Sequence, residues 1–346
     1  MKKISLVVDK IFLNNKIFEN DPILNFDNYL AYMRHLKLEL AAIGYNLSTY
    51  DINKLEESEL VFYFEINNEV KLPSSAEEIN KAYLFIWECQ IITPNIYDLT
   101  LHDYFNKIFT FRDDLVDNHR YFKINYSFDI PKKLDFNLKD TNKLCTLVAG
   151  HKRSHHHLEL YSKRIEAIRW FELNAPNDFD LYGRGWDKYV SSNRVMRKLS
   201  KESRLLNYLF SKLLFKPYKS YKGELVNKVD KLKEYKFCIC YENARDMPGY
   251  ITEKIFHAFF AGCVPIYWGA NNITDFIPSN CFIDKKQFRS YNELYHYIKE
   301  MSHIKYEEYL CNIERFLLGT QIEQFSIQCF SQLVIDQCIA SIGKNE

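Results

Sequence analysis

The chain lacks several features that would assign it to a class at once. It has no excess charge of one sign, since 46 Lys and Arg stand against 45 Asp and Glu, for a formal charge of +1. A nearly neutral chain has no overall basic footprint for nucleic acid. Its nine cysteines show no C-x-x-C spacing, so we expect most of them to be reduced, buried, apolar residues and not metal ligands.

Long hydrophobic runs are also missing. The apolar run after Met1-Lys2-Lys3 ends at Asp9, which is too short for the core of a signal peptide. The longest uncharged stretch, around 255–274, contains Gly, Pro and Asn and is typical of a helix, a turn and a strand. No transmembrane anchor is predicted. We therefore expect a cytoplasmic protein, and an alternative in which it docks at the inner face of the membrane stays open.

Strand-like and helix-like segments alternate along the chain, without an internal repeat. Before a break at 130–141, strands are predicted at 4–8, 60–66, 83–87 and 109–111, a helix over 26–43 that ends before Gly44, and a helix start at 74–78. After it, strands are predicted at 144–149, 180–182, 237–241 and 264–268, and helices over 160–173, 252–261, 291–301, 306–317 and 322–342. Such alternation predicts α/β layers with mostly parallel sheets.

The length of 346 residues suits two domains of ordinary size. We predict an N-terminal α/β domain over 1–140 and a C-terminal, Rossmann-like α/β domain over 141–321. A last helix over 322–346 is expected to pack back on the first domain. Two such domains facing across a cleft form the GT-B architecture of many nucleotide-sugar transferases. Other two-domain α/β proteins share this layout, so the fold alone does not give the function.

The stretch 241–269 carries the strongest chemical signal. Glu242 and Asn243 end a buried strand, and a short loop containing Pro248-Gly249 leads to a helix that begins near Thr252. In open α/β sheets, ligands bind at the carboxyl ends of strands beside helix N-termini. The free N–H groups and partial positive charge of such a terminus suit a diphosphate.

Charged residues follow at once in the first turn of this helix. Lys254 is placed to offset the negative charge that develops on a leaving nucleoside diphosphate. Glu253 is placed to accept hydrogen bonds from sugar hydroxyls, and Tyr250 to contact the donor from the loop. The alternative is a capping carboxylate and an exposed lysine at an ordinary helix start.

Three blocks in this region occur in a fixed order: Y-K-F-C-I-C-Y-E-N at 235–243, G-Y-I-T-E-K-I at 249–255 and V-P-I-Y-W-G at 264–269. Together they closely resemble the signature of family 10 glycosyltransferases, the α-1,3/1,4-fucosyltransferases. Ordered blocks are far more specific than one short motif. The resemblance implies transfer of L-fucose from GDP-fucose to a glycan hydroxyl, with an α-1,3 linkage to a GlcNAc- or Glc-type sugar. The chain looks most like bacterial members that decorate lipopolysaccharide or other surface glycans.

The resemblance also implies roles for two residues outside these blocks. Arg164, at a helix start, aligns with a donor-binding arginine that grips the diphosphate; the alternative is a surface arginine of a helix. Glu88 aligns with the proposed general base of the family. The family usually has Gly-Glu-Asn where this chain has Trp-Glu-Cys at 87–89. The alternative for Glu88 is a carboxylate that caps the next turn.

The resemblance further implies that the domain over 1–140 binds the acceptor and the domain over 141–321 binds the GDP-sugar. The implied mechanism is a single displacement with inversion. Glu88 takes the proton of the acceptor hydroxyl, while the donor is bound by the residues Arg164, Asn243, Tyr250, Thr252, Glu253 and Lys254. Further contacts with donor or acceptor are expected from Glu242, Lys222 and Arg112. No organic cofactor is required and no bound metal is expected, although Mn or Mg is expected to stimulate transfer.

Alternatives and other signals complete the prediction. The donor is alternatively another GDP-6-deoxysugar such as colitose, or the protein is a non-catalytic glycan-binding relative. The acceptor is an oligosaccharide or a lipid-linked glycan. The basic segment 188–222 is interpreted as a solvated face, with donor attraction and docking on an anionic membrane as alternatives. The D-x-D at 178–180 is interpreted as a turn entering a strand, and the histidines at 151 and 155–157 as part of a solvated loop.

Overall fold

The chain folds into two compact units. The structure is a computed structural model that describes residues 1–21, 24–66, 70–132, 134, 136, 142–190, 202–203, 205 and 216–339. Unit 1 comprises 1–132, 247–251 and 318–346, and unit 2 comprises 133–246 and 252–317. The prediction placed divisions at 140 and 321, and it had no counterpart to the short segment 247–251, because five residues carry no compositional signal of their own.

Unit 1 contains a six-stranded parallel sheet in the order β2-β1-β3-β4-β5-β6. The strands are β1 Lys2–Val7, β2 Tyr45–Thr49, β3 Leu60–Phe64, β4 Ala82–Ile86, β5 Lys107–Thr110 and β6 Tyr121–Lys123. The predicted strands of this half are thus present. β2 was not predicted because its polar residues resemble a loop. It pairs with β1, and Asn15 adds contacts at its end, where Asn15 Oδ1 accepts a hydrogen bond from Thr49 N at 2.9 Å.

The helices of unit 1 are α1 Ala31–Ala42, α2 Ala76–Asn80 and α10 Ile327–Cys338. α1 begins later than predicted, because Asp27 and Asn28 adopt left-handed φ values of 54° and 58° that interrupt the helix. Gly44 with φ of 90° follows its end, as predicted. Ser75 and Glu78 form a complete capping box at the start of α2, which confirms the predicted helix start.

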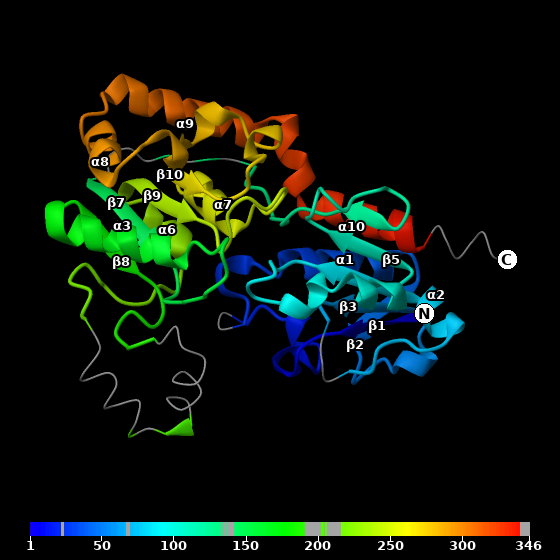
Figure 1. The fold of residues 1–346 in the computed structure, drawn as a ribbon. Coiled ribbons are helices and arrows are strands. Elements are labelled where there is room, and N and C mark those ends of the chain that lie inside the picture. Colours follow the sequence, from blue (N-terminus) through cyan, green and yellow to red (C-terminus); the bar gives the residue numbers. More distant parts are fainter. Residues whose placement is uncertain are drawn as a thin grey trace. The chain divides into compact units, whose positions relative to one another are not determined.

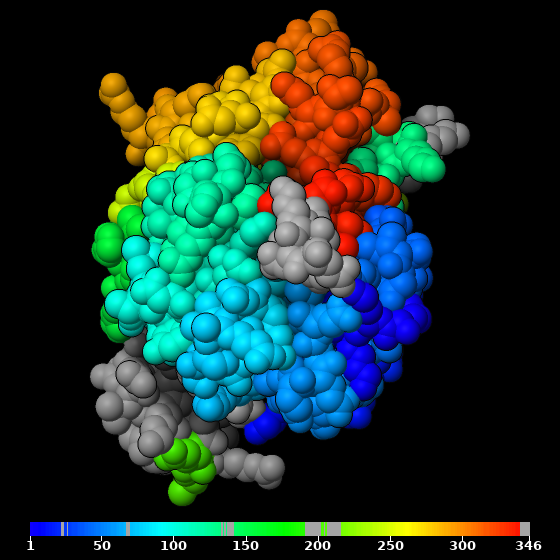
Figure 2. Space-filling view, turned by 90° about the vertical axis from the view of Figure 1, so that its right-hand side faces the viewer, coloured from blue at the N-terminus to red at the C-terminus, as the bar shows by residue number. Residues whose placement is uncertain are grey.

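The C-terminal helix α10 packs beside α1 in unit 1 (Figure 1). His35 Nδ1 lies 2.8 Å from Ser331 Oγ, and the Phe330 ring lies 5.2 Å from the Tyr32 ring and 5.5 Å from the Trp87 ring. In Figure 2 the red surface of α10 adjoins the blue surface of the first part of the chain. The helix predicted over 322–342 begins only at Ile327, because a 3₁₀ turn at Thr320–Phe325 precedes the capping residue Ser326.

Unit 2 contains a five-stranded parallel sheet in the order β11-β10-β9-β7-β8. Its strands are β7 Lys143–Val148, β8 Phe179–Tyr182, β9 Tyr235–Tyr241, β10 Val264–Trp268 and β11 Ile283–Asp284. Its helices include α3 Tyr161–Asn174, α6 Lys228–Leu232, α7 Glu253–Phe260, α8 Tyr291–Lys299 and α9 His303–Leu318. The sheets of both units confirm the predicted α/β class.

The neighbouring strands β7 and β9 form a topological switch point in unit 2. β7 leads through α3 to β8 on one side, whereas β9 leads through α7 to β10 on the other side. Because such crossovers are right-handed, α3 and α7 cover opposite faces of the sheet. Ligands of open α/β sheets bind outside the carboxyl ends of strands at such a point. A ligand site is therefore expected at the residues that follow β7 and β9.

The remaining expectations concern cysteines and membrane segments. All nine cysteines are free, and seven of them are buried, with only Cys311 and Cys329 exposed. This agrees with their prediction as small apolar core residues. In the part of the chain that the structure describes, every helix is too short or too polar to cross a membrane.

The packing of α10 generates a first prediction. Phe330→Ala should lower the free energy of unfolding by about 3–5 kcal/mol, because it removes a buried ring from the core around Tyr32 and Trp87. Urea unfolding followed by circular dichroism measures the change. Gln328→Ala, on the exposed side of the same helix, is the control and should change stability by no more than about 0.5 kcal/mol. Equal stability of the two variants would contradict the packing.

Candidate functional site

A buried carboxylate joins the end of β9 to the start of α7 in unit 2. Glu242 is fully buried. Its Oε1 accepts a hydrogen bond from Thr252 N at 2.8 Å, and its Oε2 accepts one from Thr252 Oγ1 at 2.6 Å. Lys254 Nζ lies 3.2 Å from the same Oε2. Since a buried carboxylate is costly unless it is paired and hydrogen-bonded, these contacts hold the first turn of α7 against the strand end.

The charges of the first turn of α7 are coupled to one another. Lys254 Nζ also donates to Thr252 Oγ1 at 2.8 Å and to Glu253 Oε1 at 3.3 Å, and its side chain is only 16% exposed. This excludes the alternative of an exposed lysine. Burial of Glu253 would raise its pKa, but the charges of Lys254 and Lys228 outweigh that effect and hold the pKa below its ordinary value. Glu253 is therefore ionised at neutral pH.

Arg164 reaches the same strand end from α3. It is 3% exposed, which excludes the alternative of a surface arginine. Its Nε and Nη2 donate to Tyr241 O at 3.2 and 2.6 Å, and Nη2 also donates to Asn243 Oδ1 at 3.1 Å. Asn243 O in turn accepts a hydrogen bond from Leu160 N at 3.1 Å, just before α3. The guanidinium is thus fixed at the switch point by strand and helix together.

Six of the predicted site residues come together in this cluster of unit 2: Arg164, Glu242, Asn243, Thr252, Glu253 and Lys254. The cluster contains two cationic and two anionic side chains. The sequence analysis treated Glu242 only as a possible contact with donor or acceptor. The structure shows that it is a buried carboxylate that orients Lys254 and Thr252.

A second cluster lies in unit 1, at the end of β4. Tyr250 OH donates a hydrogen bond to Glu88 Oε2 at 3.2 Å, and Tyr250 is fully buried with its ring 4.9 Å from the Phe111 ring. Gly249 has a φ of 77°, and a Cβ at this position would lie 2.1 Å from Phe111 O. Only glycine fits here, so the segment 247–251 packs closely against the rest of unit 1.

Glu65 belongs to this second cluster and was not predicted. It follows β3 with a left-handed φ of 66°. Its Oε1 accepts hydrogen bonds from the backbone N–H groups of Trp87 and Glu88, at 2.7 and 2.8 Å. Its Oε2 is buried without a hydrogen bond of normal geometry, although the Thr93 side chain lies near the carboxyl group.

The environment of Glu65 changes its protonation. Burial raises the pKa of Glu65 to about 8, and the nearby charge of Glu88 acts in the same direction. Local sequence carried no signal for this residue, because its place beside Glu88 follows from the order of the strands in the sheet. β3 and β4 are neighbours in a parallel sheet, so a carboxylate that follows one strand lies beside a carboxylate that follows the other.

Two predicted contact residues lie apart from these clusters. Arg112, in unit 1, pairs with Asp114, and its guanidinium lies 5.0 Å from the centre of the Tyr97 ring. Tyr97 OH donates to Glu88 O at 3.4 Å, so Arg112 is separated from Glu88 by one side chain. Lys222, in unit 2, is 51% exposed and lies 3.6 Å from Asp180 on β8, away from the Glu242 cluster.

The carboxylates of the D-x-D sequence have separate partners. Asp178 accepts hydrogen bonds from Lys299 Nζ and Tyr295 OH, at 2.8 and 2.7 Å. Asp180 accepts one from Tyr235 OH at 2.6 Å and pairs with Lys143 at 3.2 Å. Among the described residues, no three His, Cys, Asp or Glu side chains are grouped to hold a metal ion.

The basic segment 188–222 lies mostly outside the described residues. Residues 191–201, 204 and 206–215 are not among those that the structure describes. The prediction of membrane contact through this segment therefore falls outside them.

Comparisons with known proteins match the part of the chain that contains the first cluster. A family model described as glycosyltransferase family 10 (fucosyltransferase), C-terminal part, matches residues 156–329, which is half of the chain. An alpha-(1,4)-fucosyltransferase of Arabidopsis thaliana is 41% identical over 80 residues, which cover 22% of this chain and 20% of that protein. The alpha-(1,3)-fucosyltransferase FucT of Helicobacter pylori is 42% identical over 74 residues, covering 21% and 15%.

Both matches span a fifth or less of these relatives' own length. A larger part of the chain is similar to a solved structure in its fold. The crystal structure of an alpha1,3-fucosyltransferase matches with a TM-score of 0.56 and 18% identity, over 96% of this chain and 90% of that one. The fold, with two parallel sheets and their helices, is that of the GT-B glycosyltransferases.

The Glu242 cluster generates a prediction about stability. Thr252→Val keeps the side-chain volume but removes the hydroxyl that donates to Glu242 and accepts from Lys254. We expect it to lower the free energy of unfolding by about 1–3 kcal/mol, because a buried carboxylate oxygen loses a partner. Thr252→Ser keeps the hydroxyl and should lose clearly less. Chemical unfolding of both variants tests this, and a valine variant as stable as the wild type would contradict it.

Glu65 generates a prediction about pH. Its pKa of about 8 in the folded chain exceeds the ordinary value of 4.5, so the folded state holds a proton that the unfolded state releases. Between about pH 4.5 and 8 this group therefore makes stability fall as pH rises, by up to about 1.4 kcal/mol per pH unit. Glu65→Gln should flatten that slope. The measurement is urea unfolding at a series of pH values, and parallel curves for both proteins would refute the assignment.

Proposed function

Because this chain belongs to glycosyltransferase family 10, we propose that it is an enzyme that transfers L-fucose from GDP-fucose to a hydroxyl of an acceptor glycan. The observation that carries the proposal is the agreement between the family match over 156–329 and the Glu242 cluster, which lies within that range. The cluster sits at the switch point, where nucleotides bind in open α/β folds.

Unit 2 binds the donor in this proposal. The diphosphate meets Arg164, whose guanidinium donates to the neutral acceptors Tyr241 O and Asn243 Oδ1, and Lys254, which is paired with Glu242 and Glu253. The first turn of α7 adds N–H groups and a partial positive charge. Arg164 and Lys254 are held by Tyr241 O and Glu242, so they are oriented before the donor arrives. Preorganised cations of this kind favour departure of GDP because they cost little reorganisation. Glu253 and Asn243 bind donor hydroxyls.

Unit 1 supplies the general base. Glu88 takes the proton from the acceptor hydroxyl, whose oxygen attacks the anomeric carbon of fucose while the bond to GDP breaks, with inversion. The hydrogen bond from Tyr250 OH fixes the orientation of the carboxylate. Glu65, with a pKa of about 8, is mainly protonated at neutral pH and so adds little negative charge beside Glu88. Neighbouring carboxyls with separated pKa values are a recurrent feature of acid–base sites.

The finer assignments follow the family. We place an α-1,3 linkage on a GlcNAc- or Glc-type sugar of an oligosaccharide or lipid-linked glycan, made on the cytoplasmic side and stimulated by Mn or Mg. Purified protein, offered GDP-fucose and GDP-colitose with a glycan array, tests donor and acceptor together, and NMR of the product gives the linkage. Glycan binding without transfer of either sugar would favour a non-catalytic relative.

The proposed base can be tested by substitution. Glu88→Gln keeps the shape and the hydrogen bond from Tyr250 but removes the basic carboxylate. We expect the rate of fucose transfer to fall by about 10²–10⁴-fold, the range that general-base catalysis contributes. The affinity for GDP, measured by calorimetry, should stay unchanged because the donor binds to unit 2.

A matched control is available in the same unit. Glu56 is an exposed carboxylate of unit 1, and Glu56→Gln should keep the wild-type rate. A Glu88→Gln variant that turns over as fast as this control would refute the role of Glu88 without affecting the assignment of the donor site.

A further inference from the structure

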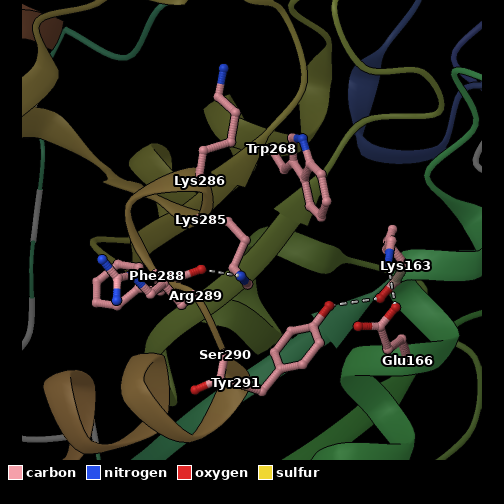
Figure 3. Close-up of a pocket in the computed structure, with 9 residues that line it drawn as sticks. All are labelled: Lys163, Glu166, Trp268, Lys285, Lys286, Phe288, Arg289, Ser290 and Tyr291. Carbon is pink, nitrogen blue, oxygen red and sulfur yellow. Dashed lines mark hydrogen bonds and ion pairs between the residues drawn. The ribbon is translucent and has the colours of Figure 1, made fainter.

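One cavity of unit 2 lies beside the Glu242 cluster and forms part of the donor site proposed for that unit. Figure 3 shows Lys285 and Glu166 on opposite sides of it. One of its walls is α3, the helix that also carries Arg164. Glu65 lies in the other unit, so the donor site does not account for its buried carboxyl group.

Glu65 stands where the regular pairing of β3 with β4 ends. Its N–H donates to Phe85 O at 3.0 Å, which continues the ladder of these parallel strands by one bond. In a regular ladder the Glu65 carbonyl would next accept the N–H of Trp87. The left-handed φ of 66° turns the chain out of the strand, and the Glu65 carboxyl group accepts that N–H instead, at 2.7 Å. A side chain therefore completes the pairing that the backbone leaves open.

All four main-chain polar groups of the dipeptide Trp87-Glu88 are hydrogen-bonded to side chains. Glu65 Oε1 accepts both N–H groups, at 2.7 and 2.8 Å. Tyr126 OH donates to Trp87 O at 2.8 Å, and Tyr97 OH donates to Glu88 O at 3.4 Å. Peptide groups that are withdrawn from water are costly unless they are paired, so these three side chains hold the dipeptide in one orientation. Glu65 supplies two of the four bonds.

The Glu88 carboxylate extends from this fixed dipeptide. Its Oε2 accepts the hydrogen bond from Tyr250 OH at 3.2 Å, so its main chain and its carboxylate are both held within unit 1. A general base has to lie within hydrogen-bond reach of the proton that it takes, and a misplacement of about 1 Å can slow a reaction by about 100-fold. A shift of the Trp87-Glu88 main chain should therefore change the rate of transfer and leave the binding of the donor unchanged.

The charge of Glu65 depends on its burial. The residue as a whole is partly exposed, but its Oε2 atom is buried, and burial raises the pKa of Glu65 to about 8. The titratable groups that face it are Glu88 after β4, Tyr32 of α1 and Tyr97 of the 3₁₀ turn Pro94–Tyr97, and none of them is a cation. The protonated carboxyl group accepts both N–H bonds without adding charge beside Glu88. Loss of this proton would leave a buried charge without a counter-ion, which disfavours the arrangement.

We propose that Glu65 is a positioning residue for sugar transfer: its carboxyl oxygen holds the Trp87-Glu88 main chain, so that the Glu88 carboxylate meets the proton of the acceptor hydroxyl. The proposal rests on the proposed role of Glu88 as the general base. Glu65 acts only through Glu88 and contacts no substrate. Glutamine offers the same acceptor oxygen without a charge, so it can replace Glu65, whereas an apolar side chain cannot.

Steady-state kinetics of the full chain, with GDP-fucose and the glycan of the array that accepts the most fucose, tests this role. We expect Glu65→Met to lower kcat by about 30- to 100-fold and to leave the KM for GDP-fucose within about twofold, because two N–H groups lose their acceptor. Glu65→Gln should keep kcat at pH 7 within about threefold of the wild type. Glu56→Met, at an exposed carboxylate of the same unit, is the matched control and should keep the wild-type rate. A folded Glu65→Met variant with the wild-type kcat, or a Glu65→Gln variant as slow as Glu65→Met, would overturn the proposal.

The pH profile keeps the test decisive if Glu65→Met does not fold, because Glu65→Gln preserves the shape of the side chain. Since the folded arrangement favours the protonated form, it is weakened as the pH rises through the pKa of Glu65. The kcat of the wild type should therefore fall above about pH 8, whereas Glu65→Gln has no proton to lose and should keep its rate to about pH 9. Parallel profiles of the two proteins would overturn the proposal.

Hydrogen exchange of the Trp87 and Glu88 amides tests the contact without any transfer. Mass spectrometry of peptides that contain both residues should show exchange at least about tenfold faster in Glu65→Met than in the wild type and Glu65→Gln. Equal exchange in all three proteins would overturn the proposal, even if the wild type transferred fucose. If the wild type transfers no fucose but exchange follows the expected pattern, the proposed function fails while the hold of Glu65 on the Glu88 main chain stands.

Discussion

The geometry of the proposed donor site depends on one interaction, the bonding of the Glu242 carboxylate to Thr252 and Lys254. A fully buried carboxylate is tolerated only where its oxygens are satisfied, and here a backbone N–H, a hydroxyl and an ammonium do so. Because Glu242 ends β9 and Thr252 precedes α7, the same bonds decide where the helix begins. The orientation of Lys254 and the position of the helix dipole are consequences of that one buried charge.

The α/β fold followed from the sequence because parallel strands are buried on both faces and therefore appear as continuous apolar runs, as in Phe237–Tyr241. β2 was not predicted because Asn46 and Ser48 are polar, and only their pairing with β1 shows that they belong to a strand. The true start of α1 depends on left-handed φ angles at Asp27 and Asn28. Such angles are chosen by packing as much as by residue type, so periodicity alone extended the helix too far.

For the site, ordered motifs identified the residues of the Glu242 cluster, since their spacing along one β-α-β unit brings them to one strand end. Arg164 was located by resemblance, and its burial could not be inferred from a helix turn that also contains the exposed Glu166. Glu65 was missed because its place depends on the order of strands in a sheet, which puts β3 beside β4, and strand order is not written in local sequence.

The segment 247–251 has a consequence for how this molecule can be divided. Unit 1 is assembled from three separate stretches of chain, and one of them is a pentapeptide that interrupts unit 2. A graft that exchanged the first 132 residues for those of a relative would leave Gly249 and Tyr250 facing a foreign surface, although Gly249 tolerates no added atom beside Phe111. Recombination at a single junction therefore cannot exchange this unit cleanly. Any chimaera has to carry these five residues, together with the C-terminal stretch, along with their partner surface.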